Sequence, residues 1–160
     1  MKPDIYWLKE IEPIRLAIMP KPRSGEWLAD EIAGYSVDGV SVLVSLLESQ
    51  EIYELGLGDE ARLCQEYNIE FISYPIADRH VPLSVELTRE LVADLISKLY
   101  SGQGVAIHCR AGIGRSGIIA AWILIKLGFT VEHAFSMLSV ARRTKVPDTA
   151  AQKDWVIKHA

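Results

Sequence analysis

Residues 105–117 read VAIHCRAGIGRSG, and this stretch decides how the rest of the chain is interpreted. Residues 105–109 form a short, continuous apolar run, which is typical of a strand buried on both faces. Residues 117–125, GIIAAWILI, are far short of the ~20 apolar residues that span a bilayer, so they predict a buried helix. Gly112 and Gly114 lie between the two runs and permit a tight turn. The stretch therefore predicts a strand, a glycine-containing loop and the beginning of a helix.

A loop of this kind can bind an anion, because its backbone N–H groups point inward and the positive end of a helix lies behind them. Arg115 can add a guanidinium that grips two phosphate oxygens at once. Cys109 lies where this positive field favours the thiolate, the nucleophilic form of cysteine. A thiolate beneath a bound phosphate is a nucleophile directed at phosphorus. The alternative interpretation is a buried core cysteine beside an incidental glycine-rich turn.

The segments around this stretch alternate between predicted strands and helices. Strands are expected at residues 5–8, 14–19, 40–47, 69–74 and 105–109, and helices at 26–33 (capped by Ser24), 59–67, 116–126, 131–143 (capped by Thr130) and 149–159. Ser84 opens one more helix, which ends at Gly102, and its core face is expected to carry Leu87, Leu91, Leu95 and Leu99. The pattern predicts a single α/β domain over residues 1–160, with a central, mainly parallel, twisted sheet flanked by helices.

Length and composition agree with one globular domain. The chain has 160 residues, of which 49% are hydrophobic and 24% are charged, and this composition excludes disorder. The net charge of −4 excludes a general attraction to nucleic acid or to an anionic membrane, so an anionic ligand must meet a local positive site. Two cysteines without a CxxC spacing, and an N-terminus without a signal-type apolar run, predict a reduced protein in the cytoplasm.

The stretch at residues 108–116 matches the signature HCxxGxxRS, so the chain resembles the cysteine-dependent protein phosphatases, tyrosine-specific and dual-specificity alike. The resemblance implies a phosphocysteine intermediate at Cys109, and neither a metal nor another cofactor. It implies that Ser116 aids loss of the thiolate and that His108 hydrogen-bonds the loop, with a packing role as the open alternative for His108. The phosphate-binding residues would be Arg110, Ala111, Gly112, Ile113, Gly114 and Arg115.

Asp78 is the candidate general acid, which is needed because the departing oxygen requires a proton. It is the only acidic residue between Glu70 and Glu86, and it precedes Cys109 by 31 residues. Its loop, PIADRHVP at residues 75–82, follows a predicted parallel strand and therefore emerges at the same sheet edge as the phosphate loop. The loop is similar to the mobile acid loop of dual-specificity phosphatases. The alternative is a turn aspartate that hydrogen-bonds its own backbone.

The resemblance covers about residues 14–156. Segments 15–32, 44–48 and 57–71 look like the cyclin-dependent kinase-associated phosphatase branch of the dual-specificity family. Gln152 resembles the glutamine that positions the hydrolytic water in some relatives, and an ordinary polar helix residue is the alternative. Cys64 is expected in the core, with a regulatory disulfide to the motif cysteine as the alternative. A basic cluster either lines the substrate entrance or lies solvated at a helix end: Arg142, Arg143 and Lys145.

The leading hypothesis is therefore hydrolysis of phosphotyrosine, and of phosphoserine or phosphothreonine, in a phosphoprotein or phosphopeptide. We expect a monomer without nucleic-acid or membrane partners, whose site also binds phosphate, sulfate or vanadate. An alternative substrate is a phosphoinositide or another small phosphomonoester, but Arg110 alone adds a charge inside the loop, where lipid phosphatases carry lysines. A non-catalytic phosphopeptide-binding module is disfavoured, because Cys109, Arg115 and Asp78 are all present. The loop is also longer than that of sulfurtransferases.

Overall fold

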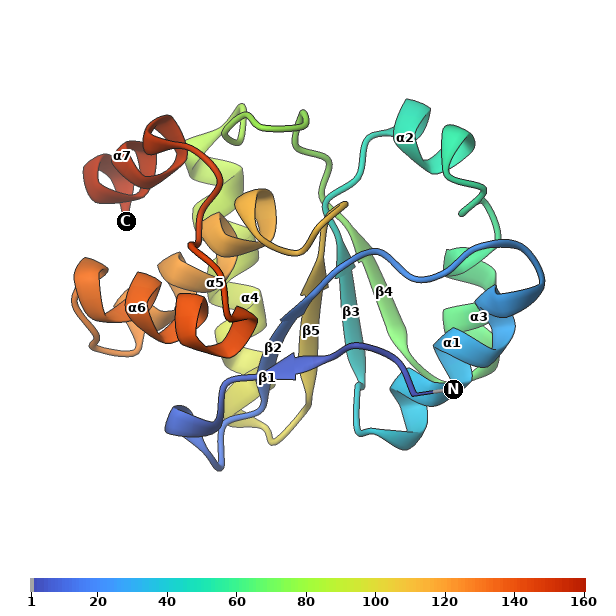
Figure 1. Ribbon diagram of the computed structural model, residues 1–160. Helices are drawn as coiled ribbons and strands as arrows, with labels where there is room; N and C mark the ends of the chain where they lie inside the picture. The colour runs from blue at the N-terminus through green and yellow to red at the C-terminus, as the bar shows by residue number, and fades with distance from the viewer. Residues whose placement is uncertain (1) are drawn as a thin grey trace.

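A five-stranded sheet of order β1-β2-β5-β3-β4 forms the centre of the computed structural model, which describes residues 2–160 (Figure 1). The strands are β1 (Tyr6–Trp7), β2 (Leu16–Met19), β3 (Val42–Ser45), β4 (Glu70–Ser73) and β5 (Val105–His108). The helices are α1 (Leu28–Val37), α2 (Ser49–Glu54), α3 (Glu60–Glu66), α4 (Val85–Tyr100), α5 (Gly114–Lys126), α6 (Val131–Arg142) and α7 (Ala150–His159). Two short 3₁₀ helices complete the chain: η1 (Lys9–Ile11) and η2 (Gly25–Trp27).

The strand that precedes the glycine loop lies in the middle of the sheet. β5 pairs in parallel with β2 on one side and with β3 on the other, so His108 is level with Met19 and Ser45. β4 continues the parallel sheet beside β3, and β1 alone is antiparallel, at the edge beside β2. Every residue of β2, β3 and β5 is buried, as the continuous apolar runs predict. The predicted α/β fold with a mainly parallel sheet is therefore confirmed.

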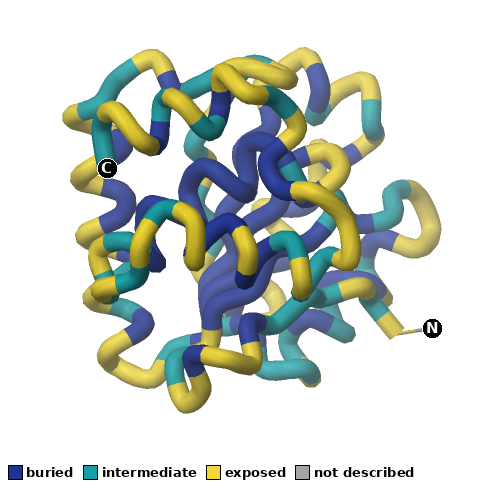
Figure 2. Tube along the Cα trace, turned by 60° about the vertical axis from the view of Figure 1, so that its left-hand side comes forward, coloured by how far each residue is buried: buried dark blue, intermediate teal, exposed yellow. Residues whose placement is uncertain are grey.

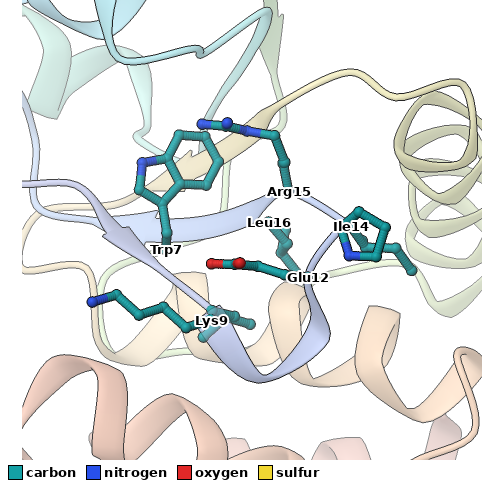
Figure 3. Close-up of a pocket in the computed structure, with 8 residues that line it drawn as sticks. Trp7, Lys9, Glu12, Ile14, Arg15 and Leu16 are labelled. Carbon is teal, nitrogen blue, oxygen red and sulfur yellow. The ribbon is translucent and has the colours of Figure 1, made fainter.

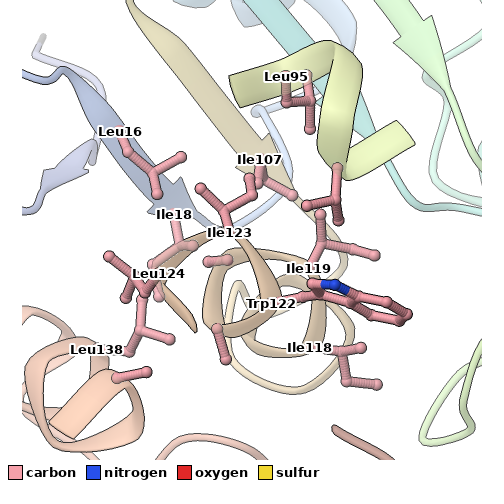
Figure 4. Packing of buried hydrophobic residues seen from close by; sticks show 14 of the residues in the cluster. Leu16, Ile18, Leu95, Ile107, Ile118, Ile119, Trp122, Ile123, Leu124 and Leu138 are labelled. Atoms are coloured by element: carbon pink, nitrogen blue, oxygen red, sulfur yellow. The ribbon is translucent and has the colours of Figure 1, made fainter. Parts of the chain in front are cut away.

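Apolar side chains pack on both faces of this sheet. Because successive residues of a strand point to opposite faces, Leu16 and Ile18 enter one cluster while Ala17 and Met19 enter the other. The larger cluster lies under α4, α5 and α6 (Figure 4), and the smaller one lies under α1 and α3. The sheet and α5 form the buried interior of the trace, with exposed residues outside it (Figure 2).

Helix α5 is buried along almost its whole length, as the run at residues 117–125 predicts. All residues from 114 to 124 are buried, and Trp122 at the centre is fully enclosed. The N-terminus of α5 is thus held by packing on every side, directly after the glycine loop. In residues 2–160, none of the helices combines the length and the apolar character that a membrane crossing requires.

Helix α4 begins as predicted but presents a different face. The hydroxyl of Ser84 accepts a hydrogen bond from the N–H of Leu87 at 3.0 Å, so the N-cap is in place. Leu95 is fully buried, whereas Leu87 is 55% exposed. Each step of four residues turns the helix about 40° beyond a full turn, so Leu87 has rotated out of the core face. Thr88 is buried instead, and its hydroxyl lies 2.7 Å from that of Tyr74.

Two other helical segments differ from prediction. The segment after Ser24 begins as a 3₁₀ turn, its side chain makes no cap hydrogen bond, and α1 starts only at Leu28. Helix α2 was not predicted, because its six residues carry no apolar periodicity. A capping box between Glu48 and Glu51 begins α2, and this polar pair is the local signal that marks it.

We predict that Leu95→Ala destabilises the protein by roughly 2–5 kcal/mol, because it leaves a cavity in the larger core cluster. Leu87→Ala is the matched control on the same helix and should change stability by no more than about 0.5 kcal/mol. Urea unfolding of both variants measures the difference. Equal losses would mean that Leu87 contributes to the core despite its exposure.

Candidate functional site

The predicted site lies at the carboxyl ends of the parallel strands. The phosphate loop (residues 109–115) joins β5 to α5, helix α2 follows β3, and the segment with Asp78 follows β4. Figure 1 shows these three segments at the same edge of the sheet. This is the edge at which ligands bind in open parallel sheets.

The backbone of the phosphate loop is held by hydrogen bonds from outside it. The ring Nδ1 of His108 lies 3.1 Å from the carbonyl oxygen of Cys109, and the N–H of Lys21 donates to the carbonyl of Arg110 at 3.1 Å. In the opposite direction, the N–H of Gly112 donates to the sulfur of Cys109 at 3.3 Å. Carbonyl groups that are bonded outward leave the N–H groups of the loop available for an anion.

Arg142, at the C-terminal end of α6, holds the next part of the loop. Its Nη2 donates to the carbonyl of Ala111 at 2.9 Å, and its Nε donates to the carbonyl of Gly112 at 3.1 Å. The same guanidinium lies 4.1 Å from the centre of the Tyr6 ring of β1, in cation–π geometry. Neither interpretation of the basic cluster fits this residue, because Arg142 braces the loop from behind rather than lining an entrance or lying free in solvent.

Two glycines allow the loop to pass so close to its neighbours. Gly112 has φ +73°, and a Cβ there would come within 2.3 Å of the backbone of Met19. At Gly114 a Cβ would come within 2.4 Å of Asp148 Oδ2 and 3.0 Å of the side-chain amide of Gln152. Any larger residue at either position would displace the loop or its supports.

The guanidinium of Arg115 is buried beside the loop and bonded by two other segments, α2 and the segment after β4. Its two terminal nitrogens lie 2.7 Å and 3.0 Å from the carboxylate oxygens of Glu51. One of them also donates to the carbonyl of Ile76 at 2.8 Å, and the other to Asp78 Oδ1 at 3.1 Å. The side chain is 2% exposed, so these partners orient it with little competition from water.

Glu51 is a site residue that sequence reasoning missed, although its capping box marks the start of α2. Burial by itself would raise the pKa of this carboxyl, but hydrogen bonds from Arg115 and from the backbone of Glu48, and the charges of Arg115 and Arg110, hold it below its ordinary value. The carboxylate is therefore ionised, and it keeps the buried guanidinium in place.

Asp78 lies at the site, as its loop predicted. Its carboxylate is half-exposed and bonds the same guanidinium that is expected to bind phosphate. The next residue, Arg79, has φ +62°, so the chain turns sharply after Asp78. The structure thus brings the candidate acid and the candidate phosphate ligand into direct contact.

Gln152 is fully buried and links α7 to the acid loop. Its Nε2 donates to the carbonyl of His80 at 3.1 Å, and its Oε1 accepts from the N–H of Thr149 at 3.2 Å. It therefore differs from an ordinary solvated helix residue. Asp148, which lies against Gly114 beside it, is a second carboxylate near the loop that sequence reasoning passed over.

His108 and Ser116 flank the loop and are both fully buried. Besides the carbonyl of Cys109, the His108 ring contacts Glu60 of α3, with Nε2 and Oε2 2.5 Å apart. The hydroxyl of Ser116 makes no hydrogen bond to any residue from 2 to 160. It is thus available to a group that forms in the site during a reaction.

Comparison with known proteins agrees with this arrangement. A family model described as "Polymorphic toxin system, DSP-PTPase phosphatase" matches residues 17–129. The chain belongs to this phosphatase family. A putative tyrosine phosphatase, 197R, of Invertebrate iridescent virus 6 is 35% identical over 115 residues, which are 66% of this chain and 42% of the viral protein. The chain thus spans less than half the length of that relative.

Solved structures share the fold of this chain over nearly its whole length. Kinase-associated phosphatase, with its catalytic-site cysteine replaced by serine, has a TM-score of 0.88 at 20% identity and is matched over 98% of this chain and 93% of its own. Tk-PTP in the active form has a TM-score of 0.79 at 25% identity, over 99% of this chain and 96% of its own. The predicted similarity to dual-specificity phosphatases is confirmed, and the fold is like that of kinase-associated phosphatase.

Cys64 lies apart from the candidate site. It packs in the smaller core cluster, on the face of the sheet opposite to the cluster that contains Cys109, and both cysteines are free thiols. Burial and the charge of Glu60 raise the pKa of the Cys64 thiol to about 12. Cys64 therefore stays protonated and unreactive at neutral pH.

One hollow of the surface lies away from this site. A cavity of about 550 Å³ is lined by Trp7, Arg15 and neighbouring residues at the amino end of β2, opposite to the edge that carries the phosphate loop (Figure 3).

The other two residues of the basic cluster are solvent-exposed. Arg143, with φ +56°, ends α6, and Lys145 follows it, which fits the solvated-helix-end interpretation. Residues 2–160 contain no cluster of three or more His, Cys, Asp or Glu residues that could hold a metal ion.

We predict that Glu51→Gln destabilises the protein at pH 7 by roughly 1–3 kcal/mol, because it weakens the partner of a buried guanidinium. The folded-state pKa of Glu51 is lowered, so the stability it contributes is present above its unfolded-state pKa and is lost as pH falls through the folded-state value. The difference in free energy of unfolding between wild type and variant should therefore narrow on acidification. Urea unfolding at a series of pH values measures it, and a gap that stays constant would refute the ionised pair.

Proposed function

We propose that residues 1–160 form a single phosphatase domain that hydrolyses phosphotyrosine, and phosphoserine or phosphothreonine, in phosphoproteins. The observation that carries the proposal is a buried cysteine sulfur within a loop whose four successive carbonyls, from Cys109 to Gly112, are bonded outward. A phosphoryl group in this loop would meet backbone N–H groups, the guanidinium of Arg115 and the sulfur at once. Such a site stabilises the charge of a transferring phosphoryl group.

In the first step, the Cys109 thiolate attacks phosphorus, so that an S–P bond forms while the bond to the leaving oxygen breaks. Arg115 and the N–H groups of residues 110–114 bind the phosphoryl oxygens. Asp78 gives its proton to the leaving oxygen, so the product departs as a neutral alcohol or phenol. The contact between Asp78 and Arg115 supports this role, because it holds the carboxyl group beside the phosphate position.

In the second step, water attacks the phosphocysteine, Asp78 takes a proton from that water, and inorganic phosphate leaves. The hydroxyl of Ser116 donates a hydrogen bond to the departing thiolate, a role supported by its burial without a partner among residues 2–160. Gln152 holds the acid loop through the carbonyl of His80. We assign it this supporting role in place of water positioning, since its amide is already engaged.

The substrate class follows from the charges around the loop. Arg110 is 46% exposed and is the one cation that the loop adds beside Arg115, which suits a single phosphate better than a highly charged inositol phosphate. Phosphate, sulfate and vanadate should bind as anions, and no cofactor or metal is expected to take part. A monomeric state and a cytoplasmic location stay predictions.

We predict that Cys109→Ser abolishes hydrolysis of p-nitrophenyl phosphate, assayed with EDTA, while vanadate binding and the unfolding midpoint change little. A serine hydroxyl keeps the volume of the thiol but is not ionised at neutral pH. Cys64→Ala is the matched cysteine control and should keep full activity. Residual activity of a few per cent in the serine variant would refute the proposal. With the wild type, faster hydrolysis of inositol phosphates than of phosphopeptides would favour the alternative substrate.

We predict that Asp78→Asn lowers the rate on a phosphotyrosine peptide by roughly 10²–10⁴-fold, the usual contribution of a positioned acid. The loss should be smaller on p-nitrophenyl phosphate, whose leaving group needs less help. The basic limb of the pH–rate profile should flatten in the variant, since that limb reports loss of the acid's proton. Asp148→Asn is the matched control, and a greater loss there than at Asp78 would move the acid to Asp148.

A further inference from the structure

We propose that Glu60 is a positioning residue for the phosphate loop, which holds the His108 ring at Nε2 and thereby keeps Nδ1 on the carbonyl of Cys109. The inference rests on the proposed phosphatase function and adds to it a residue on the far side of the sheet. Glu60 begins α3, one of the helices over the smaller core cluster, and His108 ends β5. The two residues are 48 positions apart in the chain.

The hydrogen bonds of His108 determine where its protons lie. Nδ1 faces the carbonyl oxygen of Cys109, which can only accept, so Nδ1 carries a hydrogen. Nε2 lies 2.5 Å from Glu60 Oε2, closer than an ordinary N–H···O bond. At that separation one proton must lie between the two atoms, since otherwise their lone pairs would face each other.

The surroundings of the pair offer Glu60 no other hydrogen-bond partner. Both side chains are 1% exposed or less, and Oε1 of Glu60 makes no hydrogen bond within residues 2–160. Tyr35 of α1 and Cys64 of α3 are the nearby titratable groups, and burial together with the charge of Glu60 raises the pKa of each. Both neighbours therefore stay neutral, and His108 is the one ring that Glu60 orients.

The carbonyl that His108 holds belongs to Cys109, so its position matters directly for the site. Cys109 supplies both the nucleophilic sulfur and the first of the outward-bonded carbonyls. If the ring turned away, this carbonyl would lose its hydrogen bond. The start of the loop would then shift, and shifts of about 1 Å in a site can cost 10²-fold in rate. Glu60 prevents this because its carboxyl group holds the ring at Nε2, in the place where Nδ1 donates to that carbonyl.

The test compares Glu60→Gln with Glu60→Leu. The amide of glutamine can donate to Nε2 and so preserves the Nδ1–H tautomer without the carboxyl group. We expect Glu60→Gln to keep kcat and vanadate inhibition within about threefold of wild type, and Glu60→Leu to lose roughly tenfold to hundredfold in both. Glu31→Gln is the matched control. This second buried glutamate pairs with Arg23, at 2.7 Å, and its substitution should change neither quantity.

Nitrogen-15 NMR of histidine-labelled protein reads the tautomer directly, without any assay of activity. We expect His108 to carry a hydrogen on Nδ1 and a hydrogen-bonded Nε2 in the wild type and in Glu60→Gln, and to lose the hydrogen bond at Nε2 in Glu60→Leu. If the leucine variant fails to fold, Glu60→Asp replaces it, because the shorter carboxylate cannot reach Nε2.

Three results would overturn the inference: a wild-type His108 without a proton on Nδ1, a Glu60→Leu enzyme as active as wild type, or a Glu60→Gln enzyme as impaired as Glu60→Leu. A wild type that does not hydrolyse p-nitrophenyl phosphate would instead refute the proposed function. The NMR result on the tautomer would still stand in that case, so the two failures are distinguishable.

Discussion

The site depends on the outward hydrogen bonding of four successive carbonyls in the phosphate loop. The donors come from three directions: the end of β5, the segment after β2 and the end of α6. A chain as short as this loop could not hold its N–H groups inward by itself, because each peptide would turn its polar groups toward whatever partner was nearest. The surrounding fold supplies those partners, and it thereby preorganises an anion site before any anion arrives.

The buried guanidinium of Arg115 also depends on partners from the surrounding fold, in this case because of its charge. A lone arginine at 2% exposure would be costly, so it is balanced by Glu51 and half-exposed Asp78. Glu51 belongs to a helix that the fold places beside the loop, and its carboxylate orients the fork toward the phosphate position. The acid loop is thereby tied to the same cation. The proposed proton donor and the proposed phosphate ligand are thus positioned by one connected set of side chains, which is Glu51, Arg115 and Asp78.

Much of this arrangement could be predicted from local patterns. The run at residues 105–117 predicted β5, the loop and α5, because apolar periodicity and glycine placement act over a few residues. Two of the differences from prediction have causes that are also local. Leu87 broke the expected face of α4 because a spacing of four drifts around a helix, and α2 escaped prediction because it is short and polar.

The sequence by itself determined the order of the strands and of every α-helix except α2, the phosphatase signature and the carboxylate that follows β4. Tertiary structure alone decided which distant groups support them: Glu51, 64 residues from Arg115, and Glu60, 48 residues from His108. Arg142, assigned to a surface cluster by its composition, turned out to brace the loop. The physical reason is that propensity and periodicity act within one element. Contacts between elements depend on which strands become neighbours, and the sheet order places β5 between β2 and β3.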